Sequence, residues 1–137
     1  PDAYHVFNDF TVGRNHVDHV VAGPGGVFAI ETKFWNGKVT VEDGHVLVDG
    51  QLPDRSPLSQ ANREAALVRN ALAAAGWNGL VTPVVAFASD SFTAHRANLK
   101  GTIIINSNEL KSSFDTDRVV IPPAELERLV SLTEGIG

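Results

Sequence analysis

Asp18 and Glu31 are the two residues of this chain whose types and spacing best suit chemistry. They lie on two segments that read as strands, joined by a four-residue link (residues 23–26) that contains three glycines. Such a link predicts a tight antiparallel hairpin, in which Ala22 pairs with Val27 and Asp18 falls directly opposite Glu31. Two carboxylates placed this way repel unless a cation neutralises them, so the spacing predicts a divalent metal site. Oxygen ligands suit Mg²⁺ or Mn²⁺.

Lys33 and His16 complete this cluster by alternation. Side chains alternate along a strand, so Lys33 shares the face of Glu31, and His16 falls opposite Lys33. An ammonium group at this place can meet a phosphate oxygen or help to deprotonate a metal-bound water. The alternative is that these are solvated charges at a strand end. Apolar residues on both faces of the two strands argue against that alternative.

Three strands precede the first helix and position the cluster. We expect them over residues 3–12, 16–22 and 27–35, which are rich in β-branched and aromatic residues. A second hairpin is expected from Lys38 to Asp49, turning at Asp43-Gly44.

A helix follows, because Ser56 is a typical N-cap, Pro57 suits the first turn and Gly76 is a typical stop after Leu58–Ala75. Beyond it we expect two buried strands, a short helix and a last helix, in that order. The whole order indicates an α/β fold (α+β-like), with a central mixed β-sheet flanked by helices. The later segments are residues 80–88, residues 102–105, a short helix capped by Ser107 or Asn108 that runs through Leu110, and a helix from Pro122-Pro123 to about Thr133.

The composition excludes several classes of site. The 137 residues include no cysteine, which excludes disulfide scaffolds, thiolate zinc sites, iron–sulfur clusters and a cysteine nucleophile. The length fits one domain spanning residues 1–137. No apolar run is long enough to cross a membrane and no leader opens the chain, so we expect a cytoplasmic protein without membrane contact. The chain has no methionine, so we also expect that an N-terminal stretch precedes it.

The combined motifs resemble the NERD (nuclease-related) domain of the PD-(D/E)XK nuclease superfamily, over roughly residues 4–75. The resemblance implies a restriction-endonuclease-like core. It also implies that Asp18, Glu31 and the backbone carbonyl of Thr32 bind Mg²⁺ or Mn²⁺, that Lys33 is catalytic, and that Gln60 belongs to the site. An N-terminal helix that often adds a glutamate in this superfamily would lie upstream of Pro1. The motifs are Asp18-His19-Val20-Val21, Gly23-Pro24-Gly25-Gly26-Val27-Phe28, Ile30-Glu31-Thr32-Lys33 with Trp35 and Gly37, and Pro57-x-x-Gln60.

The charge balance limits which residues could bind nucleic acid. The net charge is −5, without a basic block, so we expect a few placed cations rather than a basic surface. His16, Arg14 and Arg63 are candidate substrate contacts. The first hypothesis is a divalent-metal-dependent nuclease that hydrolyses phosphodiester bonds, with DNA as the expected substrate. The second is a catalytically inactive nuclease-fold module that binds nucleic acid or protein, and the third is an unrelated α/β domain.

Overall fold

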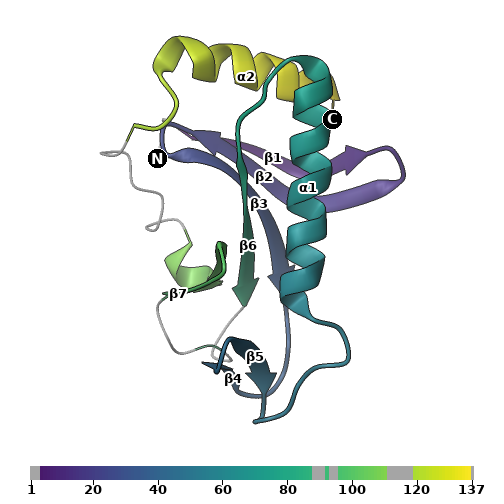
Figure 1. The fold of residues 1–137 in the computed structure, drawn as a ribbon, viewed down its shortest axis with the longest axis vertical. Helices are drawn as coiled ribbons and strands as arrows, with labels where there is room; N and C mark the ends of the chain where they lie inside the picture. Colours follow the sequence, from purple (N-terminus) through teal and green to yellow (C-terminus); the bar gives the residue numbers. More distant parts are fainter. Residues whose placement is uncertain (1–3, 88–91, 93–95, 111–118, 137) are drawn as a thin grey trace.

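A six-stranded mixed sheet forms the centre of the molecule (Figure 1). The computed structural model describes residues 4–87, 92, 96–110 and 119–136. The strand order is β1-β2-β3-β6-β8-β7, and β4 and β5 form a separate two-stranded hairpin. The strands are β1 (His5–Val12), β2 (Asn15–Gly23), β3 (Gly26–Lys33), β4 (Val39–Glu42), β5 (His45–Val48), β6 (Val81–Phe87), β7 (Arg96–Leu99) and β8 (Thr102–Asn106). The helices are α1 (Pro57–Ala75) and α2 (Pro123–Ile136).

The hairpin of β2 and β3 has the predicted register. Ala22 pairs with Val27, and the recorded pairing continues to His19 opposite Ile30. Strands β1 to β3 are antiparallel neighbours, whereas β3 pairs with β6 in parallel. A parallel pair needs a long crossover connection. The chain between β3 and β6 supplies it with the β4–β5 hairpin and α1, so the crossover carries α1 onto the sheet beside β3.

A close approach at Gly23 fixes the start of the chain against this hairpin. A Cβ atom at Gly23 would lie 2.0 Å from the ring of Tyr4, and the Tyr4 hydroxyl accepts a hydrogen bond from the backbone N–H of Gly25. We expect Gly23→Ala to lower the free energy of unfolding by about 1–3 kcal/mol, because the ring must move. Gly135→Ala, on an exposed helical position with nothing within 4 Å, should be neutral or stabilising. Urea denaturation of both variants checks this, and equal effects would contradict it.

Helix α1 starts and ends at the predicted residues. The Ser56 hydroxyl accepts a hydrogen bond from the N–H of Ser59, Pro57 occupies the first turn, and Gly76 caps the end in the left-handed conformation at φ 109°. The buried positions of the helix follow its 3.6-residue period. They are Pro57, Ala61, Glu64, Ala65, Val68 and Leu72, so the apolar stripe of the helix contains one carboxylate.

The sheet is covered on both faces where the cluster lies. Val20 and Ala29 pack against Val68 and Leu72 of α1 on one face, while Ile30 packs against other strands on the opposite face. Strand β6 contributes to clusters on both faces, as predicted for a buried strand. Helix α1 runs along the sheet and α2 lies across one end (Figure 1). Val20 and Ala29 share a face with Asp18 and Glu31 by alternation, so α1 covers the same face of the sheet that carries the two acidic residues.

Both tryptophans belong to the packed interior rather than to an exposed stacking surface. Trp77 is 5% exposed within the cluster under α1. Trp35 is partly buried: its ring lies 5.4 Å from that of Phe87, and it packs against a cluster to which β4, β5, α1, β6 and β8 contribute.

One strand was not predicted, and several predicted boundaries were wrong. Strand β7 was not predicted, because Arg96–Leu99 is short and polar; it forms only by pairing with β8 at the sheet edge. Strand β3 ends at Lys33, before the predicted Trp35. The short helix is a 3-10 turn capped by Asn106, whose side chain accepts from the N–H of Asn108. Helix α2 continues past Thr133 to Ile136, because an exposed glycine at position 135 is tolerated there.

None of the helices in the described ranges is long and apolar enough to cross a membrane.

Candidate functional site

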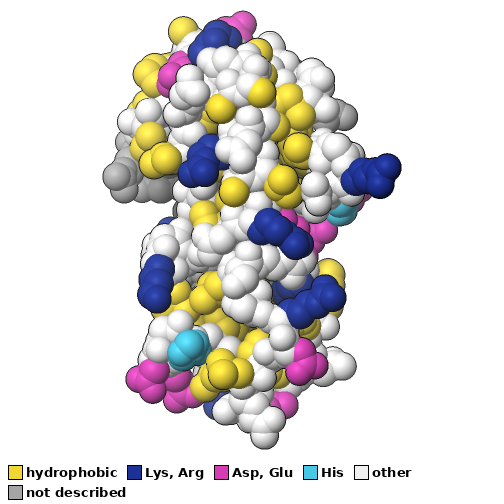
Figure 2. Space-filling view, turned by 45° about the vertical axis from the view of Figure 1, so that its right-hand side comes forward, with side chains coloured by type: hydrophobic (Ala, Val, Ile, Leu, Met, Phe, Trp, Pro, Cys, Tyr) yellow, Lys and Arg dark blue, Asp and Glu magenta, His cyan; other side chains and the backbone are white. Residues whose placement is uncertain are grey.

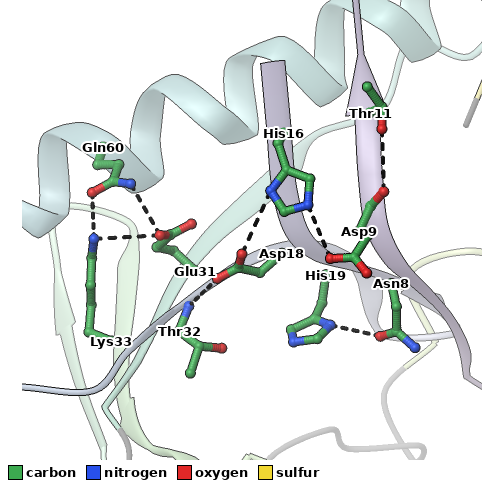
Figure 3. A network of polar contacts seen from close by, with 10 residues as sticks. All are labelled: Asn8, Asp9, Thr11, His16, Asp18, His19, Glu31, Thr32, Lys33 and Gln60. Atoms are coloured by element: carbon green, nitrogen blue, oxygen red, sulfur yellow. Dashed lines mark hydrogen bonds and ion pairs between the residues drawn. The ribbon is translucent and has the colours of Figure 1, made fainter. Parts of the chain in front are cut away.

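The Asp18 carboxylate lies beside the backbone of Glu31. The recorded pairing of β2 with β3 ends at His19 and Ile30, so Asp18 and Glu31 are the next residues along the two strands. In place of a further backbone bond, Asp18 Oδ2 accepts a hydrogen bond of 3.0 Å from the backbone N–H of Thr32. Figure 3 shows the Asp18 side chain directed toward the Glu31 side of this junction. The two strands therefore present both carboxylates at the place where they separate.

Gln60 connects Glu31 with Lys33. Its amide nitrogen donates to Glu31 Oε1 at 3.1 Å, and its amide oxygen accepts from Lys33 Nζ at 2.6 Å (Figure 3). Lys33 Nζ also lies 3.5 Å from Glu31 Oε1. The side chains of Lys33 and Glu31 are only 18% and 11% exposed, so their interaction is screened less than that of a surface pair. The first turn of α1 thus holds the ammonium and the carboxylate of β3 at fixed positions.

Glu64 is a third carboxylate at this site, one turn further along α1 than Gln60. It is 6% exposed, and its Oε2 atom has no hydrogen-bond partner. Burial, a hydrogen bond shared with Glu31, and the negative charges of Glu31 and Asp18 raise the pKa of Glu64 to about 8, although Lys33 opposes the shift. Glu64 therefore holds a proton at neutral pH, and the carboxylates of Glu31 and Glu64 share it.

Sequence reasoning selected Gln60 and passed over Glu64. The signal that could have found it is its place in the apolar stripe of α1, between Ala61 and Val68. Glutamate is almost never fully buried without a partner, and this stripe packs against the sheet face on which Glu31 was expected. A carboxylate facing another carboxylate across a packed interface indicates a functional group.

The donor set fits a hard divalent cation. Asp18, Glu31 and Glu64 offer carboxylate oxygens, and Glu64 Oε2 is a buried oxygen without a partner among the described residues. Within the described ranges, no group of three or more His, Cys, Asp or Glu side chains is arranged so that it could hold a metal ion. Mg²⁺ commonly takes one or two carboxylates together with waters and substrate phosphate, so an incomplete cage suits it. Burial is the largest cause of the raised pKa of Glu64, and the charges of Glu31 and Asp18 add to it; a cation at these carboxylates would offset that added repulsion.

The remaining predicted residues lie around this cluster rather than in it. His16 pairs with Thr11 of β1, not with Lys33; its Nδ1 lies 3.9 Å from Asp18 Oδ1 and its Nε2 lies 3.1 Å from Asp9 Oδ1. Strand β2 pairs with β1 on its other edge along most of its length, and its recorded pairing with β3 ends at His19, before His16. Arg14 is exposed in the turn between β1 and β2. Arg63 is exposed on α1, on the rim of a groove that Gln60 also lines.

A comparison with protein-family models identifies the chain. The model of the nuclease-related domain, NERD, matches residues 1–88, a range that contains β1 to β6, α1 and every residue of the cluster described above. No curated protein and no solved structure matches the chain. Because the matched range covers more than half of the 137 residues, the chain belongs to the NERD (nuclease-related domain) family.

Proposed function

We propose that this chain is a divalent-metal-dependent nuclease that hydrolyses phosphodiester bonds of nucleic acid, with DNA as the expected substrate. One observation supports this most: where β2 and β3 separate, Asp18 and Glu31 lie near enough to the buried Glu64 for their charges to raise its pKa, and Glu31 Oε1 lies 3.5 Å from the ammonium nitrogen of Lys33. Phosphodiester hydrolysis needs a place for added negative charge and a group that handles protons. Membership of the nuclease-related family supports the same reaction class.

Asp18 and Glu31, with the backbone carbonyl of Thr32, would hold Mg²⁺ or Mn²⁺. When bound, such an ion supplies a Lewis acid that lowers the pKa of water and offsets the charge of the phosphate. The Thr32 N–H already fixes Asp18, and the Gln60 amide already fixes Glu31. These two hydrogen bonds hold the carboxylates before any ligand arrives, which reduces the reorganisation needed at the moment of reaction.

Lys33 is the residue that meets the reacting phosphate. Its ammonium group has one firm partner, Gln60 Oε1 at 2.6 Å, and a second at 3.5 Å on Glu31. An ammonium group has three donors, so one remains for a phosphate oxygen or for the attacking water. In the reaction the water oxygen would form a bond to phosphorus and the bond from phosphorus to the leaving oxygen would break, while one water proton passes to solvent and the leaving oxygen takes up a proton from solvent.

Glu64 supplies a carboxylate whose protonation is expected to change when a cation binds to Asp18 and Glu31. At neutral pH it is protonated beside Glu31 because its pKa is about 8. Neutralising the charges of Glu31 and Asp18 would remove two of the smaller causes that raise this pKa, so the pKa of Glu64 would fall, while burial, the largest cause, would remain. Uptake of the cation is therefore expected to release a proton near pH 7, which calorimetry in two buffers of different ionisation enthalpy measures.

Incubation of the chain with end-labelled DNA and RNA, single- and double-stranded, tests the function. The expected result is cleavage in Mg²⁺ or Mn²⁺ and none in excess chelator, with DNA cut faster than RNA. Salt-sensitive binding without product would instead support the inactive binding module. Cleavage that continues in the chelator would contradict the metal-dependent mechanism.

A further inference from the structure

A groove beside the proposed catalytic cluster carries a positive charge that the cluster does not use. It has a volume of about 440 Å³ and is lined by Arg55, Ser56, Ser59, Gln60 and Arg63. The lining therefore consists of two guanidinium groups, two hydroxyl groups and one amide. No acidic side chain is among the described residues that line it, although the chain has 16 acidic and 11 basic residues.

The two arginines have free donors. Both are exposed, and neither forms an ion pair with another described residue. A guanidinium group presents a planar fork of donors that matches a phosphate. On the face where α1 comes forward, Figure 2 shows Lys and Arg side chains spread along the molecule, whereas most of the visible Asp and Glu side chains lie toward its two ends. The residues that line the groove lie at and just before the start of α1.

Gln60 makes the groove continuous with the catalytic cluster. It lines the groove, and the same side chain contacts Lys33 Nζ at 2.6 Å and Glu31 Oε1 at 3.1 Å. Gln60 therefore separates an anion in the groove from the ammonium group of Lys33, which is proposed to contact the reacting phosphate. Nucleic-acid backbones carry one phosphate per nucleotide, so a strand that places one phosphate at Lys33 brings a neighbouring phosphate close by.

We propose that this groove binds the backbone phosphate next to the one that is cleaved, with Arg55 and Arg63 as its main donors. This inference rests on the proposed function and adds a substrate requirement to it. The substrate is an oligonucleotide with a phosphate flanking the cleaved bond, and a single-phosphate diester lacks the second anchor. The contact is to the backbone, so it positions the strand without selecting a base sequence.

The test compares the double variant Arg55→Ala/Arg63→Ala with Arg69→Ala, an exposed arginine on the same helix that does not line the groove. Binding of a fluorescent oligonucleotide is measured by anisotropy over a range of salt concentrations, in chelator so that cleavage does not interfere. We expect the dissociation constant of the double variant to rise about tenfold or more, and the slope of log K against log salt to fall by about one. Arg69→Ala should stay within about twofold of the unsubstituted chain.

A neutral methylphosphonate beside the cleaved position locates the contact. It should weaken binding by the unsubstituted chain and change binding by the double variant little, because the groove is then already disabled. Equal binding by the double variant and Arg69→Ala would contradict the proposed phosphate binding in the groove, whether or not the chain cleaves. Binding that depends on the two arginines, without cleavage in Mg²⁺, would contradict the proposed nuclease activity but would support binding of the nucleic-acid backbone in the groove.

Discussion

Replacing Lys33 by methionine is expected to lower the cleavage rate by about 10³-fold. The variant keeps most of the length and apolar volume of the side chain but removes the ammonium group that lies 2.6 Å from Gln60 Oε1 and 3.5 Å from Glu31 Oε1. That group is the proposed partner of the reacting phosphate, and removing one such charge or proton donor commonly costs 10²–10⁴-fold. Single-turnover cleavage of labelled DNA in Mg²⁺ measures the effect.

Lys38→Met is the matched control. Lys38 is exposed, and the hydrogen bonds recorded for it use its backbone: its N–H donates to the Asp49 carboxylate and its carbonyl accepts from the Asp49 N–H. This variant should cleave within about twofold of the unsubstituted chain, and thermal melts should show both variants folded. A Lys33→Met variant as active as Lys38→Met would remove Lys33 from the mechanism.

The second large effect concerns Glu64 and the dependence of stability on pH. The pKa of Glu64 is about 8 in the folded chain against an ordinary value of 4.5, so between these two values the folded state holds a proton that the unfolded state has released. The stability that this proton supports is complete below about pH 4.5, falls as the pH rises, and is lost above about pH 8. Each pKa unit corresponds to about 1.4 kcal/mol, and we expect a loss on the order of 2–4 kcal/mol.

Glu64→Gln isolates this contribution, because glutamine has the shape of a protonated glutamate and stays neutral at every pH. Near pH 5 the variant and the unsubstituted chain should unfold at similar urea concentrations. Near pH 9 the variant should be the more stable by the full difference. The measurement is made in chelator, and Glu125→Gln, at an exposed position of α2, serves as the control. A constant difference between pH 5 and pH 9 would show that Glu64 does not titrate as the site requires.

The hairpin and the start of α1 were predictable because local signals determine them. A link with three glycines fixes a register, which placed Asp18 beside Glu31 on the neighbouring strand, and the alternation of side chains along a strand placed Lys33 on the same face as Glu31. Ser56, Pro57 and Gly76 set the ends of α1 in the same local way. Gln60 entered the site through the family resemblance, and the structure gives it a physical role, the bridge between Lys33 and Glu31.

The features that were not predicted depend on contacts between distant segments. Glu64 becomes a site residue only because the crossover lays one stripe of α1 on the acidic face of β3, and sequence spacing alone does not say which turn of α1 faces Glu31. Strand β7 exists only because β8 offers it an edge. His16 was expected opposite Lys33, yet the recorded pairing of β2 with β3 ends before His16. Its recorded partner is Thr11 of β1, on the other edge of β2.

The proposal that Asp18 and Glu31 form a metal-dependent nuclease site is tested most directly by one measurement, the initial rate of DNA cleavage in Mg²⁺ for the unsubstituted chain and for Glu31→Gln. Glutamine keeps the shape of the side chain and can still contact Gln60, but it lacks the negative charge that a cation needs. We expect cleavage by the unsubstituted chain and a loss of about 10³-fold or more in the variant. Equal cleavage by the two proteins would contradict it.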